Sequence, residues 1–128
     1  MQFKTIKEIN FGLVSKKFSV EELIKDTFAL INENKVLNCF ISLNKENALA
    51  RAKKIKVSKD SHLLSGIPIA QKDLFCTKGI KTTCGSKMLE SFYPPYSSKV
   101  EEALNAAGSI CIGTVSYTHL TLPTKLEV

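Results

Sequence analysis

The sequence is short of several features that would assign it to a class at once. It has no tryptophan, two histidines and four cysteines among 128 residues, and it contains no run of about 18 apolar residues of the kind that spans a membrane. Its start, Met1-Gln-Phe-Lys-Thr-Ile-Lys7, has neither the apolar core nor the small-residue cleavage site of a secretion signal. These absences predict a soluble, cytoplasmic protein.

Residue types that bind metals are scattered along the chain. No two cysteines form a Cys-x-x-Cys pair, and neither His62 nor His119 stands at the spacing of a metal ligand. The sequence therefore predicts no zinc site, no other metal site and no disulfide framework. We expect the cysteines to be reduced core residues, at positions Cys39, Cys76, Cys84 and Cys111.

The chain is basic, with a net charge of +6 and an isoelectric point of about 9.2. Such a charge suits an anionic partner such as tRNA, but it also suits a lysine-rich surface that only contacts water. A non-catalytic basic binding module is one functional hypothesis. The sequence offers no aromatic-rich RNA-binding motif, no glycine-rich phosphate loop and no helix-turn-helix in its support. At 44% hydrophobic residues, the chain has enough apolar side chains for the core of one modest domain.

Apolar spacing predicts helices at the start of the chain. Ile6, Ile9 and Leu13 recur at helical spacing, and Ser19-Val-Glu-Glu22 matches a capping box that opens a second helix. A short apolar strand over Asn38–Leu43 is expected next, followed by a third helix. Asn44 is the expected cap of that helix.

A second apolar strand, over Ile67–Gln71, leads directly into Lys72. Strand side chains alternate between faces, so Lys72 is expected to share a face with Pro68 and Ala70, beside small and apolar neighbours at a buried edge of a sheet. Complete burial disfavours the ammonium form and would leave a neutral amine that can accept a proton from a serine. The alternative is a strand-end lysine whose charged head reaches water.

A polar stretch follows this strand. Lys78-Gly79 predicts a turn, and the loop from Thr82 to Ser86 is rich in threonine, glycine and serine. Loops of this composition can approach a ligand closely, which makes Gly85 and Ser86 candidate substrate-loop residues. A plain surface turn, in which Gly85 supplies an unusual backbone angle, is the other interpretation.

The last predicted elements form a crossover. Tyr93-Pro-Pro-Tyr96 predicts an extended stretch, and Ser98-Lys-Val-Glu101 matches a second capping box, opening a helix that ends at Gly108. A strand over Ser109–Gly113 follows. A strand, a helix and a further strand in this order predict a crossover unit in an α/β sheet.

Several motifs in order resemble the start of the amidase signature family. They are Gly66-Ile-Pro-Ile-Ala-Gln-Lys-Asp73, the run Cys76-Thr-Lys-Gly-Ile-Lys-Thr-Thr-Cys-Gly-Ser-Lys-Met-Leu-Glu90, and Tyr93-Pro-Pro-Tyr96. The resemblance implies the N-terminal portion of the family's α/β fold, a mixed sheet flanked by helices, which is incomplete here and would expose strand edges. It also implies that Lys72 is the catalytic lysine of a triad with two serines, one of them in a cis peptide. Both serines belong to a downstream segment of the family pattern that this sequence does not contain.

Within the family, these motifs are most similar to amidase subunits that act with tRNA. That resemblance implies glutamine as ammonia donor, the B and C subunits of an amidotransferase as partners, and Glu-tRNA(Gln) or Asp-tRNA(Asn) reached through the complex. ATP would be used by the B subunit, and this chain would bind no cofactor. An amidase acting on another amide is the alternative. Because no residue here matches either serine, we expect the chain alone to be inactive.

The end of the sequence departs from the family pattern. After Gly113 the pattern continues Lys-Thr-Asn-Met-Asp-Glu-Phe, whereas this chain has Thr114 and then the segment Val115–Val128. Val115 to Thr124 is the translation of the transposon-end sequence used in a common sequencing-library kit. We therefore expect residues 1–114 to be the N-terminal part of an amidase domain and 115–128 to be a non-native tail. A divergent natural C-terminus is the alternative.

Overall fold

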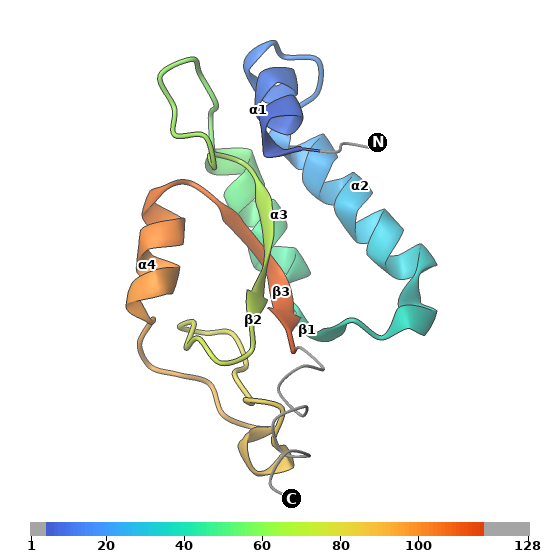
Figure 1. Cartoon of the computed structure of the whole chain (residues 1–128), viewed down its shortest axis with the longest axis vertical. Helices are drawn as coiled ribbons and strands as arrows, with labels where there is room; N and C mark the ends of the chain where they lie inside the picture. The colour runs from blue at the N-terminus through green and yellow to red at the C-terminus, as the bar shows by residue number, and fades with distance from the viewer. Residues whose placement is uncertain (1–4, 117–128) are drawn as a thin grey trace, which may run out of the picture.

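The computed structural model describes residues 5–116 as four α-helices and a small mixed sheet (Figure 1). The helices are α1 (Ile6–Val14), α2 (Val20–Glu33), α3 (Lys45–Lys54) and α4 (Lys99–Ala106). The strands are β1 (Phe40–Leu43), β2 (Pro68–Lys72) and β3 (Ile110–Val115), and two short 3₁₀ turns, η1 (Lys35–Leu37) and η2 (Lys87–Leu89), lie in the connections. In Figure 1, α2 and α4 lie on the two sides of the sheet. The α/β class expected from the sequence is confirmed.

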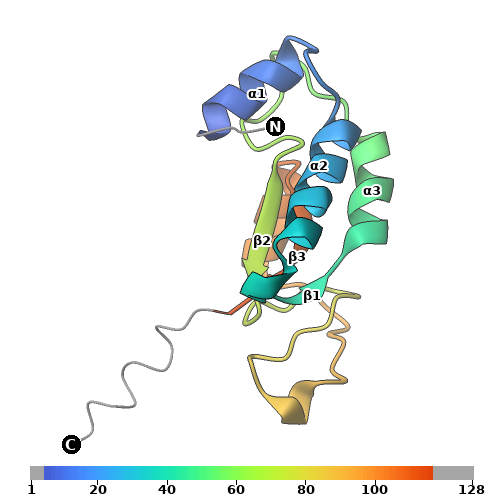
Figure 2. The same cartoon turned by 90° about the vertical axis from the view of Figure 1, so that its right-hand side faces the viewer.

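The sheet has the strand order β1-β3-β2, with β3 in the centre. β3 pairs antiparallel with β1 and parallel with β2. The connection from β2 to β3 passes through α4, so the predicted crossover unit is confirmed. Since β2 and β3 are parallel, their carboxyl ends lie at the same end of the sheet, and the segment 73–98 extends beyond that end (Figure 2).

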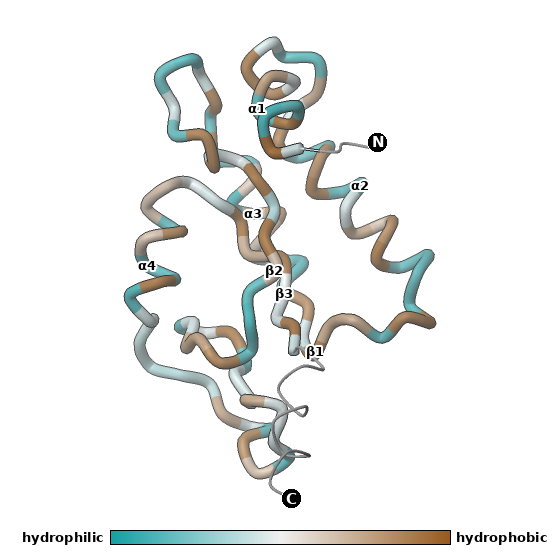
Figure 3. Tube along the Cα trace, in the orientation of Figure 1, coloured by the Kyte–Doolittle hydropathy of each residue, from teal (hydrophilic) through white to brown (hydrophobic). Residues whose placement is uncertain are grey.

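The core lies where α2 and α3 meet the strands. Ile24 and Ile110 have no exposed surface, and Leu23, Phe28 and Ile112 are also buried. In Figure 3, hydrophobic and hydrophilic segments alternate along α2, as expected of a helix with one buried face. Ala48 and Ala52 of α3 complete the contact, and their small side chains let the two helices approach closely.

The junction between α4 and β3 requires a glycine. Gly108 has φ of +84°, and a Cβ atom there would lie 2.9 Å from Ser65 Oγ and 3.1 Å from Ser65 Cα. The Gly108 carbonyl oxygen accepts a hydrogen bond from the Gly66 N–H at 2.9 Å. This contact joins the start of β2 to the start of β3 and sets the parallel register.

Several expected details differ in the structure. The first strand is shorter than expected, because Asn38 has a left-handed backbone, with φ of 47°, and ends η1. Asn44 does precede α3, but its side chain does not cap the helix; it donates to the Cys111 carbonyl oxygen at 3.3 Å instead. The cysteines are free thiols, but none is fully buried: Cys39 and Cys84 are exposed, so their expected place in the core is wrong.

The two outer strands each have an unpaired edge in the described part of the chain, because β3 is the only strand between them. Next to β1, apolar side chains are exposed, with 96% of Val36, 68% of Leu37 and 49% of Leu43 accessible to water. β3 extends through Val115, two residues beyond the expected end, because Val115 pairs with both Phe40 and Lys72. The proposed tail falls almost entirely outside residues 5–116 and remains a prediction.

Candidate active site

Lys72 is the last residue of β2 and pairs with Val115 at the end of β3. It lies at the carboxyl end of the parallel pair, the edge at which α/β sheets commonly bind ligands. The side chain is half-buried. The edge position agrees with the sequence interpretation, whereas complete burial does not occur among the described residues.

The more buried face at the end of β2 belongs to Gln71. This side chain is 3% exposed, while Ala70, on the expected apolar face, is exposed. A register shift between Ile69 and Ala70 interrupts the regular pairing of β2 with β3. The expectation that Lys72 projects among buried apolar neighbours is therefore wrong in this detail.

Asp73, which sequence reasoning did not single out, organises the region next to Lys72. The residue is 2% exposed, and its carboxylate accepts hydrogen bonds from the Thr83 N–H at 3.0 and 3.1 Å, from the Thr83 hydroxyl, and from the Gly85 N–H at 3.4 Å. The Asp73 backbone adds two bonds, donating to the Val115 carbonyl oxygen at 2.8 Å and accepting from the Cys84 N–H at 2.9 Å. Asp73 therefore joins the ends of β2 and β3 to the loop that contains Gly85 and Ser86.

The loop itself is a tight turn. Cys84 and Gly85 have φ values of 52° and 70°, and the Ser86 N–H donates to the Thr83 carbonyl oxygen at 2.9 Å. Positive φ at both central positions is the signature of a type I′ turn, which favours glycine. The unusual backbone angle expected at Gly85 is confirmed. The Ser86 hydroxyl accepts from the Met88 N–H at 3.2 Å and caps η2.

A cavity of about 270 Å³ and one of about 260 Å³ lie near these segments. The smaller one is lined by Thr83, Gly85 and Ser86 together with Ile41 and Lys81. The candidate loop therefore borders a hollow on the same end of the sheet as Lys72, although Lys72 does not line it. Asp73, the residue after Lys72, bonds to Thr83 and Gly85 of this loop, and the Ser86 N–H bonds to Thr83 within the turn.

A thiol and a phenol lie at the outer side of this region. The Cys76 thiol lies 3.9 Å from the Tyr96 hydroxyl, and this hydrogen bond raises the pKa of Tyr96. Within residues 5–116, no group of three His, Cys, Asp or Glu side chains is arranged to hold a metal ion. None of the helices in that range has the length and apolar character needed to cross a membrane.

Comparison with known proteins places this geometry in a family. The family model described as Amidase matches residues 22–123 of the chain. The chain belongs to the amidase family. The A subunit of glutamyl-tRNA(Gln) amidotransferase from Pseudomonas fluorescens (strain Pf0-1) is 50% identical over 127 residues, a match that covers 96% of this chain and 26% of that protein. The protein of the same name from Coxiella burnetii (strain RSA 493 / Nine Mile phase I) is 44% identical over 131 residues, covering 99% of this chain and 27% of its own length.

Solved amidase structures agree with the fold. An amidase family protein from Bacillus anthracis str. Ames superposes with a TM-score of 0.81 at 25% identity, over 88% of this chain and 24% of that chain. The peptide amidase of Stenotrophomonas maltophilia gives a TM-score of 0.80 at 21% identity, with the same coverage of 88% and 24%, which supports the fold alone. The amidase chain described here spans about a quarter of the length of these relatives.

Proposed function

We propose that this chain carries the lysine-bearing part of the A subunit of a tRNA-dependent amidotransferase, which hydrolyses glutamine to supply ammonia. The position of Lys72 carries this proposal: it lies at the carboxyl end of a parallel strand pair, beside a loop fixed by the buried Asp73. The 50% identity to such a subunit over 96% of the chain supports this choice over an amidase that acts on another amide.

The proposed chemistry gives Lys72 the role of general base. The Lys72 amine accepts a proton from the relay serine, which in turn accepts the proton of the nucleophilic serine. The oxygen of the nucleophilic serine attacks the side-chain amide carbon of glutamine. The C–N bond of that amide then breaks, and the nitrogen takes back the relayed proton and leaves as ammonia. Water then hydrolyses the acyl-enzyme to glutamate. Both serines would come from the part of the family pattern beyond this sequence.

The partners of the proposed complex follow from the same assignment. Ammonia would pass to a cytoplasmic B subunit that activates Glu-tRNA(Gln) or Asp-tRNA(Asn) with ATP, helped by a C subunit. No ATP-binding role is assigned to this chain. The net charge of +6 suits a complex that handles tRNA.

The test measures ammonia release from glutamine by the longer protein read from genomic DNA past Gly113. We expect Lys72→Ala to lower kcat by about 10²–10⁴-fold, the usual contribution of general acid–base catalysis. Lys54→Ala is the matched control, since Lys54 is an exposed lysine at the end of α3. A Lys72→Ala protein that keeps at least half of the wild-type rate would contradict the proposal.

The 128-residue chain provides a second comparison. We expect it to release no ammonia above background, because a general base without its nucleophile cannot form the acyl-enzyme. Ammonia release by the pure chain that is abolished by Lys72→Ala would overturn this expectation. If the chain instead binds tRNA with a steep dependence on salt concentration and the longer protein is inactive, the basic binding module replaces the amidase.

A further inference from the structure

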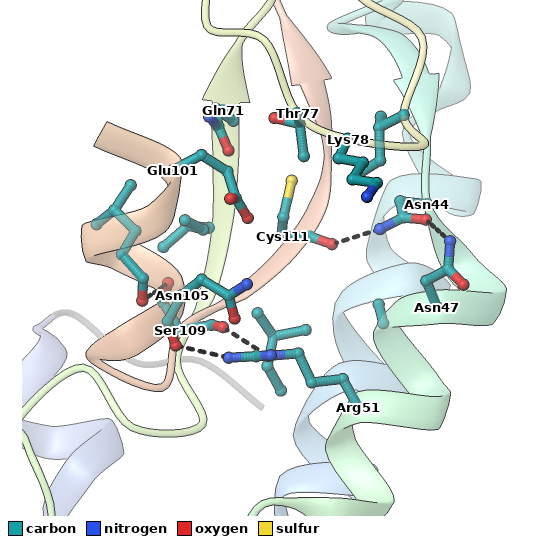
Figure 4. A pocket seen from close by; sticks show the side chains of 15 residues that line it. Asn44, Asn47, Arg51, Gln71, Thr77, Lys78, Glu101, Asn105, Ser109 and Cys111 are labelled. Atoms are coloured by element: carbon teal, nitrogen blue, oxygen red, sulfur yellow. Dashed lines mark hydrogen bonds between the residues drawn. The ribbon is translucent and has the colours of Figure 1, made fainter. Parts of the chain in front are cut away.

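One cavity lies between α3, α4 and the strands (Figure 4), and neither Gly85 nor Ser86 lines it. It has a volume of about 270 Å³. Consecutive strand residues point to opposite faces, so Gln71, which lines this cavity, points away from the side occupied by Lys72. The proposed glutaminase chemistry uses none of Gln71, Glu101 and Lys78, which line this cavity.

The Gln71 side chain has unsatisfied hydrogen-bonding capacity. It is 3% exposed, and neither Nε2 nor Oε1 has a hydrogen-bond partner among residues 5–116. Leaving a buried polar group unpaired destabilises the fold, so native proteins satisfy nearly all such groups. A buried amide that lines a polar cavity therefore points to a ligand that both donates to Oε1 and accepts from Nε2.

A carboxylate faces the same cavity because its local partner is occupied elsewhere. Glu101 stands at the third position of α4, where the glutamate of a capping box bonds back to the N-cap N–H. Here the Ser98 N–H donates to the Cys76 carbonyl oxygen at 2.7 Å. The Glu101 side chain has no hydrogen bond or ion pair within the described residues, and it points toward Gln71 and Cys111 in Figure 4.

The cavity also has a cationic side. Lys78 extends its side chain toward the cavity from the turn after β2, opposite Glu101 (Figure 4). No ion pair joins Lys78 to Glu101 in the described structure, although both line one small space. The two charges are held apart on opposite sides of the cavity.

The floor of the cavity is fixed by Arg51. Its Nε donates to the Ser109 carbonyl oxygen at 3.1 Å, and its Nη2 donates to the Asn105 carbonyl oxygen at 2.7 Å. These bonds tie α3 to the end of α4 and hold the cavity open between them. Burial, together with the nearby Glu101 carboxylate, raises the pKa of the Cys111 thiol, so this thiol stays neutral and adds no charge of its own.

We propose that this cavity binds a small zwitterion of the class of free α-amino acids. The ligand's ammonium group lies between the Glu101 carboxylate and Gln71 Oε1, and its carboxylate lies between Lys78 Nζ and Gln71 Nε2. Such a ligand satisfies both unpaired atoms of the buried amide and bridges the two separated charges. An ammonium or a carboxylate alone satisfies only half of this arrangement.

The test is an NMR titration of the 128-residue chain with L-alanine, following the side-chain amide signals of Gln71. Two matched probes each lack one charge: L-alaninamide has no carboxylate, and propionate has no ammonium. We expect saturable shifts with L-alanine and affinities at least about tenfold lower for both other probes, because each loses a charge-assisted hydrogen bond.

Variants separate binding from folding. Glu101→Gln keeps the shape of the side chain and removes its charge, and we expect it to weaken L-alanine binding by about tenfold or more. Glu102→Gln removes the same charge one residue later on α4, where the side chain is 55% exposed and pairs with Lys99, and should leave binding unchanged. Gln71→Leu should fold at least as well as the wild type, since it replaces an unpaired buried amide, but should not bind.

Several results would overturn the proposal. They are equal affinities for the three probes, an unchanged affinity in Glu101→Gln, or no saturable binding of L-alanine, including the case of a chain whose spectra lack the dispersion of a folded protein. None of these results bears on Lys72, so a failure here and a loss of the proposed glutaminase activity are distinguishable.

Discussion

Two helices of this amidase chain begin with the same motif and use it differently. At the start of α2, Glu22 N–H donates to the Ser19 hydroxyl at 3.1 Å, and Ser19 N–H donates back to Glu22 Oε2 at 2.7 Å. At the start of α4, Glu101 N–H donates to the Ser98 hydroxyl at 3.3 Å, but no bond returns to the glutamate. The sequence predicts a capping box at both places, and only the first is complete.

The difference lies in what else the N-cap residue contacts. Ser19 follows a short exposed loop, and its N–H is available to the Glu22 carboxylate. Ser98 N–H instead meets the Cys76 carbonyl oxygen, from the segment that follows β2. The long-range bond from Ser98 to Cys76 therefore replaces the local bond to Glu101, and the Glu101 side chain lines a cavity instead. The local motif is complete at the start of α2, whereas tertiary contacts replace the expected bonds at Asn44 before α3 and at Ser98 before α4.

The largest expected effect comes from the strongest tertiary contact of that edge. Asp73→Ala removes the acceptor of the Thr83 and Gly85 N–H groups and leaves a buried N–H unpaired. We expect a loss of about 2–4 kcal/mol in the free energy of unfolding. Urea unfolding followed by far-UV circular dichroism measures it, since the chain has no tryptophan to report by fluorescence. A loss below about 1 kcal/mol would mean that the turn at Cys84 and Gly85 holds without Asp73.

Sequence reasoning anticipated the elements whose signals are local. The amphipathic repeat of α2 and the glycine after α4 were predicted from short patterns of neighbouring residues, and the crossover was predicted from the order of strand, helix and strand along the chain. The family resemblance supplied Lys72 as a candidate, which spacing alone could not distinguish from a strand-end lysine.

The missed features depend on residues far apart in the sequence. Asp73 is an anchor because Thr83, ten residues later, donates hydrogen bonds to its carboxylate. The Asn44 side chain donates to the Cys111 carbonyl oxygen rather than to the start of α3. The expected burial of Lys72 assumed an unbroken alternation along β2, which the shift between Ile69 and Ala70 interrupts. An aspartate directly after an apolar strand was the one available signal for a buried anchor, since a buried carboxylate requires partners nearby.

The two N-cap serines should differ in how much they stabilise the chain. Ser19→Ala breaks a complete box and should cost about 1 kcal/mol, within the usual range for N-cap losses. Ser98→Ala removes one hydroxyl acceptor at 3.3 Å and leaves the bond from its N–H to Cys76 in place, so we expect roughly half that cost. Paired urea unfolding curves of the two variants measure the difference. Equal losses would mean that the incomplete box is as stabilising as the complete one.

The smallest expected effect concerns the two glutamates themselves and depends on pH. Hydrogen bonds from Ser19 lower the pKa of the exposed Glu22 carboxyl. A carboxyl whose pKa is lower in the folded state stabilises the fold above its unfolded pKa of about 4.3 and loses that contribution as pH falls through the folded value. Glu22→Gln should therefore destabilise the chain slightly near neutral pH and leave it unchanged in acid.

Glu101→Gln should change the free energy of unfolding less than Glu22→Gln does at neutral pH, because the Glu101 carboxylate accepts no hydrogen bond from its own helix start within the described structure. Urea unfolding of both variants between about pH 3 and pH 7 makes the comparison, since this interval spans the carboxyl titration. A destabilisation by Glu101→Gln that disappears in acid, as for Glu22→Gln, would mean that the second box closes in solution. The Glu101 carboxylate would then accept a hydrogen bond from Ser98 and would not be available to a ligand. The unfolding curves would in that case argue against the zwitterion site before any ligand is added.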